Sequence, residues 1–140
     1  MENTDLGILF KKITITSILK AISSFFLLET KINYSPPYQR GYIWTKAKAT
    51  YLIESILLHG EIPPIVLYKK SEAHLEVIDG RQRWETIHRI LNDALCLQHS
   101  GLEKLQYIAG LKFSQFDKEM QECIRTAKLR CMVIEAKNEN

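Results

Sequence analysis

The sequence has 140 residues, of which 46% are hydrophobic and 25% are charged, and its formal net charge is +3. These values are typical of one globular domain, they exclude disorder over most of the chain, and so mild a charge does not by itself indicate nucleic-acid binding. The longest apolar stretch, near 25–28, is far too short to span a bilayer, and the first residues lack the pattern of a signal peptide. We therefore expect a cytoplasmic protein without membrane contact.

Helices and extended segments alternate along the chain. Apolar residues recur at helical spacing in several segments, Thr45 is the expected N-cap of one helix, and Ser114-x-x-Asp117 resembles a capping box before another. The predicted elements, in chain order, are a helix over 16–28, a strand over 31–34, a helix over 46–58, a hairpin of strands 64–69 and 75–79, a helix from about 82 to 97, a helix up to 127 and a strand over 128–136. This order predicts a small α+β domain with a mixed β-sheet flanked by helices. The domain spans 15–136, between a lead-in over 1–14 and a polar tail over 137–140.

The stretch VIDGRQRWETIHRI, over 77–90, joins a strand end, a glycine and a helix start. Gly80 permits a backbone conformation that other residues resist, and the free N–H groups of the first helical turn carry partial positive charge. Arg81 and Arg83 add guanidinium groups at the same place, which is the chemistry of a phosphate site. Asp79 could cap the helix, anchor an arginine, hold a divalent cation or orient a water. The ordinary alternative is a capping aspartate followed by arginines that face solvent.

The segment PPYQRGYIW, around Gln39 and Arg40, places a polar pair between aromatic rings. Arg40 can bind a phosphate or a carboxylate, and the rings of Tyr38 and Trp44 can stack on a nucleobase. From 31 to 48 there are four basic residues and no acid, so a local basic and aromatic surface is a second candidate site. The alternative is that the rings cover an edge of the core and that the polar pair is simply exposed.

The remaining polar residues give weaker signals. Glu54 falls on the polar side of the helix over 46–58, so we expect it to be solvated or to pair with Arg40 or Arg83. The four histidines have no ligand spacing, and the chain has no Ser-His-Asp set, Cys-His pair or H-E-x-x-H motif. The residues alone therefore predict no metal site. Buried free thiols in a reducing compartment are expected for the three cysteines, Cys96, Cys123 and Cys131.

Four motifs in this order, SPPYQRGYIW, LIESILL, IPPIVLY and VIDGRQRWETI, resemble the DGQQR-motif family. This family is the N-terminal module of GmrSD-type modification-dependent restriction enzymes and is related to the ParB/sulfiredoxin-like fold. The resemblance covers 15–136, nearly the whole chain. It implies nucleotide binding, with hydrolysis of a nucleoside triphosphate in some members, coupled to DNA restriction.

The resemblance also implies roles for single residues. The positions that match the motifs are Asp79, Gly80, Gln82 and Arg83, together with Gln39 and Arg40 of the upstream element. Arg83 and the helix start would hold nucleotide phosphates with help from Arg81, and Asp79 would orient a metal ion or a water as the candidate catalytic residue. The upstream pair would contact the nucleotide or the motif from across a cleft, with Tyr38 or Trp44 flanking the base.

Three positions depart from the family pattern. Arg81 stands where the family has its first Gln, which keeps a donor and adds charge. Trp84 and Glu85 replace the commoner Leu-Thr, so we expect a bulky ring and an acid beside the phosphate site. These departures fall where phosphate specificity would be decided.

The expected function is a nucleotide-binding module of a bacterial phage-defence or modification-dependent restriction system, with hydrolysis left open. A nucleoside triphosphate would be its ligand, and Mg²⁺ is the candidate ion. Full-length relatives continue into a nuclease domain, so we do not expect DNA cleavage by these residues alone. The further expected partners are DNA and a nuclease-containing partner protein or C-terminal domain. The alternatives are a non-catalytic DNA- or partner-binding module of such a system, and an inactive relative that assembles with a homologue.

Overall fold

The computed structural model describes residues 11–26, 32–33 and 41–138. These residues contain a five-stranded mixed β-sheet with the strand order β1-β5-β3-β4-β2. The strands are β1 (Lys11–Ala21), β2 (Ile32–Asn33), β3 (Ile65–Ser71), β4 (His74–Asp79) and β5 (Lys128–Asn138). The α-helices are α2 (Ile22–Phe25), α3 (Lys46–Leu57), α4 (Arg81–Leu91) and α5 (Lys118–Thr126), and short 3-10 helices cover His99–Gly101, Gln106–Ile108 and Phe113–Gln115. The predicted α+β class with a mixed sheet is therefore confirmed.

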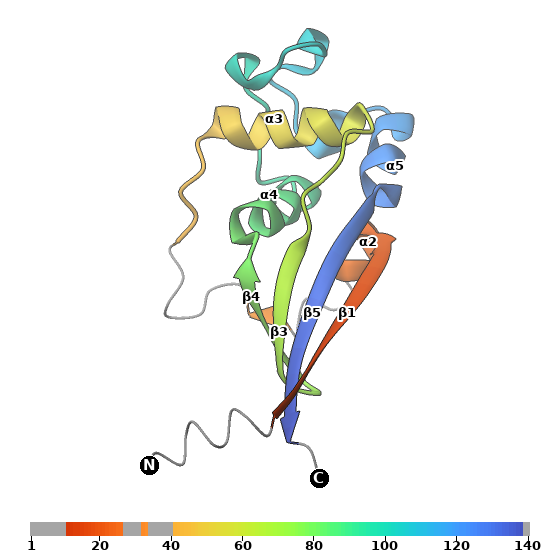
Figure 1. Cartoon of the computed structure of the whole chain (residues 1–140). Coiled ribbons are helices and arrows are strands. Elements are labelled where there is room, and N and C mark those ends of the chain that lie inside the picture. Colours follow the sequence, from red (N-terminus) through yellow and green to blue (C-terminus); the bar gives the residue numbers. More distant parts are fainter. Residues whose placement is uncertain (1–10, 27–31, 34–40, 139–140) are drawn as a thin grey trace.

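The strands pair in both directions, and the helices lie at one end of the sheet. β1 and β5 are antiparallel, as are β3 and β4, whereas β3 pairs with β5 and β2 pairs with β4 in parallel. Helices α3, α4 and α5 gather where β4 ends and β5 begins, and the strands extend away from them (Figure 1). The functional motif at the end of β4 therefore lies at the boundary between the sheet and the helical layer.

The predicted helix over 16–28 is wrong, because residues up to Ala21 form strand β1. The segment from Ile13 to Thr16 is a run of β-branched residues, which favour a strand over a helix. β1 also has a complete partner, since its register with β5 runs from Lys11↔Asn138 to Ala21↔Lys128. Only Ile22–Phe25 is an α-helix, and 27–28 lie outside the described residues. Helical spacing of apolar residues was thus outweighed by β-propensity and by pairing with a distant strand.

Helix α4 ends at Leu91 and does not reach 97 as predicted. The Asn92 side chain bonds the carbonyl of His88, with Nδ2 to O at 2.8 Å, and Asp93 has a positive φ of 62°. The carboxylate of Asp93 then accepts from both the N–H and the hydroxyl of Ser114. These hydrogen bonds hold the pKa of Asp93 below its usual value. An Asn-Asp pair therefore stops the helix and connects it to a distant turn.

Other local predictions are confirmed. The hydroxyl of Thr45 accepts from the N–H of Lys48 at 3.1 Å and caps α3, and β3 and β4 form the predicted hairpin. The last helix begins later than the Ser114 pattern suggests, because its N-cap is Asp117, whose carboxylate accepts from the N–H of Met120 at 2.8 Å.

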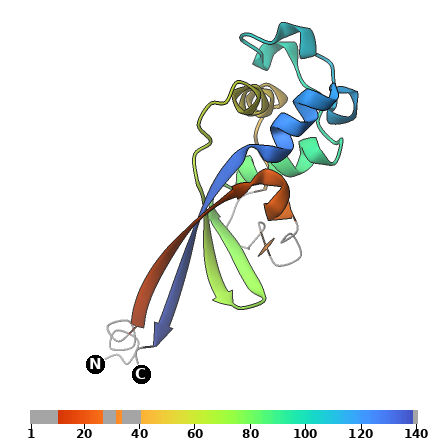
Figure 2. The same cartoon turned by 90° about the vertical axis from the view of Figure 1, so that its right-hand side faces the viewer.

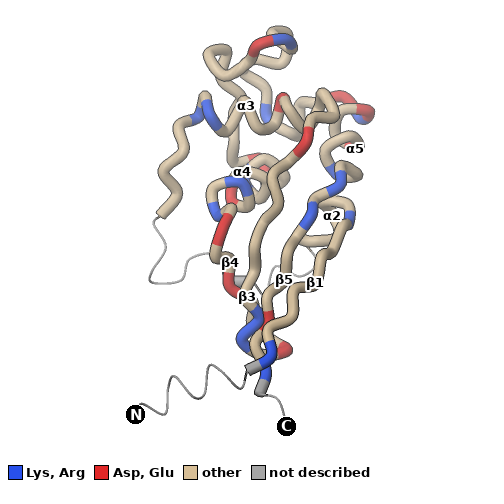
Figure 3. Tube along the Cα trace, viewed as in Figure 1, with Lys and Arg blue, Asp and Glu red and all other residues tan. Residues whose placement is uncertain are grey.

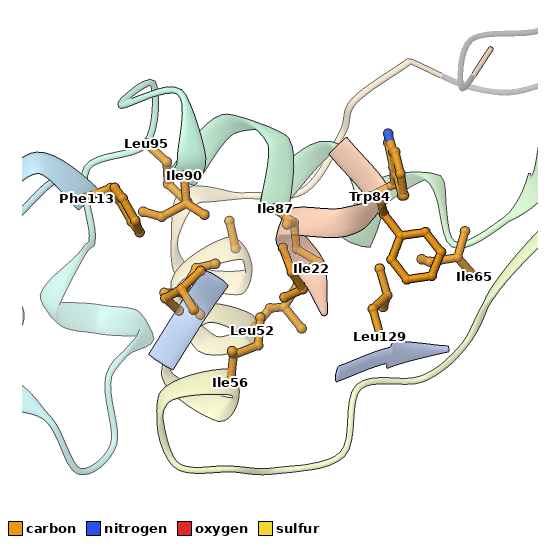
Figure 4. Close-up of a cluster of buried hydrophobic side chains, with 14 of the residues drawn as sticks. Ile22, Leu52, Ile56, Ile65, Trp84, Ile87, Ile90, Leu95, Phe113 and Leu129 are labelled. Atoms are coloured by element: carbon orange, nitrogen blue, oxygen red, sulfur yellow. The ribbon is translucent and has the colours of Figure 1, made fainter. Parts of the chain in front are cut away.

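Trp84 is fully buried and belongs to the core, not to the surface beside the motif as expected. Its ring stacks on Phe26 with centroids 5.0 Å apart and meets Phe25 edge-on at 6.5 Å. Figure 4 shows the core between α2, α3, α4 and the strands, with Trp84 near Ile65 and Leu129. Burial of this ring fixes the rotation of α4, and the neighbouring arginines are themselves largely buried, with Arg81 10% and Arg83 18% exposed.

Glu54 is also buried, 2% exposed, and is not the solvated residue that the helical pattern predicted. Its carboxylate accepts from the backbone N–H groups of Glu103, Lys104 and Leu105 at 2.7–3.2 Å. The expected pairing with Arg83 is not present, because Arg83 contacts Pro64 and Asp79 instead. Arg40, the other expected partner, lies outside the described residues. A single carboxylate on α3 thus holds residues 103–105, the loop after the 3-10 helix His99–Gly101.

The cysteines follow the expectation in part. Cys131 is fully buried, and burial raises the pKa of its thiol to about 12. Cys96 and Cys123 are only half-buried, and all three are free thiols. Within the described ranges, no helix is long and apolar enough to cross a membrane.

Candidate functional site

The junction between β4 and α4 requires a glycine. Gly80 is the N-cap of α4 and has a φ of 93°, which side chains rarely adopt. A Cβ atom at this position would lie 2.7 Å from Cδ1 of Ile65 and 2.9 Å from Nη2 of Arg83. No side chain caps the helix, and Asp79, whose side chain is 72% exposed, points to solvent instead. The N-cap of α4 is therefore Gly80 and not Asp79, which contradicts the capping-aspartate alternative.

Arg83 connects this junction to the segment before β3. Its Nη2 donates to the carbonyl of Pro64 at 2.8 Å and lies 3.9 Å from Oδ2 of Asp79. The side chain is 18% exposed, and its Nε is buried without a hydrogen-bond partner among the described residues. The guanidinium is thus held in place by one of its nitrogens and retains donors for another group.

Arg81 shares a carboxylate with Arg89 on the next turns of α4. Its Nη2 lies 3.1 Å from Oε1 of Glu85, whereas Nη2 of Arg89 lies 2.7 Å from Oε2 of the same residue. Glu85 is therefore not a free acid that would repel a phosphate, since it is neutralised between two arginines. Arg81, Glu85 and Arg89 follow one another at intervals of four residues, and this spacing could have predicted the two ion pairs from the sequence. Figure 3 shows the charges following one another along the end of β4 and α4.

These side chains line a pocket of about 200 Å³. Its walls are formed by Trp44, Ile78, Asp79, Gly80, Arg81, Gln82 and Arg83. Pockets for drug-sized ligands measure roughly 300–1,000 Å³, so this one has room for a phosphate group and not for a whole nucleotide. The structure thus brings five predicted site residues and Trp44 together. Tyr38, Gln39 and Arg40 lie outside the described residues, although Arg40 directly precedes Gly41 in the chain.

Gln82 attaches the upstream motif to α4. Its Oε1 accepts from the N–H groups of Ile43 at 2.9 Å and Trp44 at 3.1 Å, and its Nε2 donates to the carbonyl of Gly41 at 3.0 Å. The amide oxygen has both lone pairs occupied, so these contacts use most of the bonding capacity of the side chain. Gln82 therefore lines the pocket but acts mainly as a bridge between the two motifs.

Tyr42 makes a second attachment of the same segment. Its hydroxyl lies 2.8 Å from the hydroxyl of Thr86, and the guanidinium of Arg89 lies 4.2 Å from its ring centroid. Neither contact was predictable from local sequence, because the partners are 44 or more positions apart. Residues 41–44 are therefore fixed against α4 by three successive turns of the helix.

Replacing Gln82 by Ala should release residues 41–44 while α4 remains folded. The three hydrogen bonds of the Gln82 side chain are lost. This loss costs about 1–2 kcal/mol of local stability and lets the N–H groups of Ile43 and Trp44 exchange with water more often. Hydrogen exchange should show faster amide exchange at Ile43 and Trp44 by about tenfold. Gln106→Ala is the control, because among the described residues its amide donates to the carbonyl of Leu102 and not to residues 41–44. Unchanged exchange at both amides would show that Gln82 is not the attachment.

Comparison with known proteins identifies a family. The family model described as "GmrSD restriction endonuclease, N-terminal domain" matches residues 16–139. No curated protein and no solved structure matches the chain. The relation to the ParB/sulfiredoxin-like fold therefore stays a prediction.

Proposed function

Since the chain belongs to the family of GmrSD restriction endonuclease N-terminal domains, and hence to a restriction system, we propose that its pocket at the start of α4 binds the phosphates of a nucleoside triphosphate. One observation carries this proposal: the first turn of α4, which begins after Gly80, and the side chains of Arg81 and Arg83 line the same small pocket. Helix-terminal N–H groups and arginine forks are the two common ways in which proteins bind phosphate.

The charge around the pocket suits an anion. Arg81, Arg83 and Arg89 face two carboxylates, Asp79 and Glu85, so one positive charge is left over. The Glu85 carboxylate and the Pro64 carbonyl orient the two lining arginines before any ligand arrives, which reduces the entropy lost on binding.

Asp79 and Trp44 supply the remaining functions of the proposed site. Within the described ranges, no group of three or more His, Cys, Asp or Glu residues could hold a metal ion. Mg²⁺ is commonly bound by one or two carboxylates together with substrate phosphates, so the exposed carboxylate of Asp79 would hold the ion with the nucleotide. Alternatively, Asp79 would orient a water for hydrolysis. Trp44 lies at the pocket with Nζ of Lys48 5.6 Å from its ring centroid, and it would flank the base.

Replacing Arg83 should weaken nucleotide binding. The protein is titrated with ATP, GTP and CTP in the presence of Mg²⁺, and tryptophan fluorescence and calorimetry report binding. Arg83→Ala should bind the preferred nucleotide about tenfold to a hundredfold more weakly, because hydrogen bonds to charged groups contribute about 1.5–3 kcal/mol. Arg83→Lys keeps the charge but loses the forked guanidinium, so its nucleotide affinity should lie between those of the parent and Arg83→Ala.

Arg125→Ala is the control for this titration, because Arg125 pairs with Glu122 at 3.9 Å on α5 and does not line the pocket. Circular dichroism must show that all variants are folded. The proposal fails if none of the three nucleotides binds, or if folded Arg83→Ala binds as well as the parent.

Binding of DNA is the second candidate function. Lys46 and Lys48 are exposed at the start of α3, directly after Trp44. Phosphate-backbone binding at this surface would weaken steeply between low and moderate salt. A nucleotide in the pocket should be less sensitive to salt and should show a preference among bases.

A further inference from the structure

Strands β1 and β5 form a ribbon that projects from the body of the domain. Figure 2 shows this ribbon diverging from the β3–β4 hairpin, with β1 starting and β5 ending at its tip. β1 lies at the edge of the sheet and pairs only with β5 among the described strands. No other described strand pairs with the outer edge of β1, so this edge presents backbone N–H and C=O groups, and such an edge is a template for another strand.

One face of this edge strand is apolar and exposed. Ile13 is 65% exposed, Ile15 60% and Leu19 51%. Their separation by two and four residues places them on the same face of the strand, and the register sets Ala136 and Ile134 of β5 opposite Ile13 and Ile15. The opposite face carries Ile18 and Cys131, which pack in the core. Apolar side chains gathered on one exposed face mark a site of protein interaction.

The stripe ends at a large cavity. Leu19 and Arg130 line this cavity, of about 730 Å³, together with Lys128 at the start of β5 and the prolines that precede β3. Arg130 donates a hydrogen bond to the hydroxyl of Ser17. A partner strand along β1 would thus have room for a further side chain in a cavity that Lys128, Arg130 and the acid Glu61 line together.

The charges on β1 are all positive. Between 12 and 21 the only ionisable residues are Lys12 and Lys20, and neither forms an ion pair with a described residue. A second copy of β1 in antiparallel pairing about Thr16 would place Lys12 opposite Lys20, which is unfavourable. DNA would leave the isoleucines uncovered, and lipid would leave the backbone of the free edge without hydrogen-bond partners. The surface therefore fits an acidic strand of a different protein.

We propose that β1 is the docking edge for an antiparallel β-strand of another protein, with apolar side chains opposite Ile13, Ile15 and Leu19 and carboxylates opposite Lys12 and Lys20. The added strand pairs with the backbone of β1. Its apolar side chains pack beside Ile13, Ile15 and Leu19 on the same face, and its carboxylates neutralise both lysines. This interaction is independent of nucleotide binding, because the ribbon and the pocket share no residue.

The test uses a synthetic peptide, Glu-Val-Thr-Ser-Thr-Val-Thr-Val-Glu, and a control peptide in which Lys replaces both Glu. Each is titrated into the isotope-labelled protein, and the amide signals are followed by NMR. The acidic peptide should shift signals of β1 and bind about tenfold more tightly than the control peptide. In the variant Lys12→Glu/Lys20→Glu this preference should invert, whereas Lys12→Arg/Lys20→Arg should keep it. Ile15→Ser should weaken both peptides.

Three results would overturn the proposal: no shift of β1 signals with either peptide at millimolar concentration, equal affinity for the two peptides, or a preference that the charge reversal leaves unchanged. Sedimentation that shows self-association through β1 would replace the proposal by a homodimer. Binding of duplex DNA or of anionic vesicles that the charge reversal abolishes would replace it by those partners. ATP, GTP and CTP titrations of the same variants should be unchanged, so failure here is separate from failure of the nucleotide site.

Discussion

Replacing Glu54 by Gln is expected to lower the free energy of unfolding by about 3 kcal/mol. The buried carboxylate accepts from three consecutive backbone N–H groups, those of Glu103, Lys104 and Leu105. Glutamine keeps the shape but turns one acceptor into a donor, which then faces N–H groups and leaves at least one of them unpaired. Hydrogen bonds to a charged acceptor are the stronger kind, and an unpaired buried donor is costly.

Urea unfolding at neutral pH measures this loss, and Glu103→Gln is the matched control. That substitution removes the same charge from the same loop, but the side chain of Glu103 is exposed and only its backbone N–H contacts Glu54. The control should change stability by less than about 0.5 kcal/mol. Equal losses in the two variants would show that the loop responds to net charge and not to the buried acceptor.

The effect of Glu54 should depend on pH. Burial acts to raise the pKa of this carboxyl, but the hydrogen bonds from Leu105, Glu103 and Lys104 and the charge of Lys104 outweigh burial, so the pKa lies below its usual 4.5. A lowered pKa in the folded state means that the ionised form stabilises the fold fully above the ordinary value. This stabilisation is lost as the pH falls through the lowered pKa. The difference between parent and Glu54→Gln should therefore shrink below about pH 4.5.

Elements with local signals were predictable from the sequence. Thr45 begins α3 through its own hydroxyl, and Gly80 separates β4 from α4, so both boundaries follow from residues within four positions. β1 was not predictable in this way. Its apolar residues also fit a helix, and the β-propensity of Ile13–Thr16 decides for a strand only together with the register to β5, more than 100 positions away.

The site was predictable as a location and not as a network. The glycine and arginines after a strand predict a candidate phosphate site from local residues alone, and the structure places these residues around one pocket. The role of Gln82, in contrast, depends on Ile43 and Gly41, about 40 positions upstream. Trp84 could be read as a surface ring, because the sequence does not give the rotation of α4 about its axis. Burial against Phe26 fixes that rotation.

Replacing Gly80 by Ala should destabilise the protein and weaken the nucleotide site together. The φ of 93° is strained for alanine, and the new methyl group would lie 2.7 Å from Cδ1 of Ile65 and 2.9 Å from Nη2 of Arg83. Strain and overpacking together should cost about 3 kcal/mol. The arginine would have to leave the carbonyl of Pro64, so nucleotide affinity should fall about tenfold, as when one charged hydrogen bond is lost.

Gly110→Ala separates the two causes of this loss. Gly110 also has a positive φ, 84°, but a Cβ atom there would meet nothing within 4 Å. It should therefore lose only the conformational part, about 1 kcal/mol, and should bind nucleotide like the parent. The difference between the two variants in urea unfolding then measures the cost of displacing Ile65 and Arg83. If Gly80→Ala were no less stable than Gly110→Ala, the close approach of Arg83 would not contribute to the cost of the substitution. Gly80 would then be needed only for its positive φ. If stability fell and nucleotide affinity did not, the phosphates would be bound without Arg83 in its observed position.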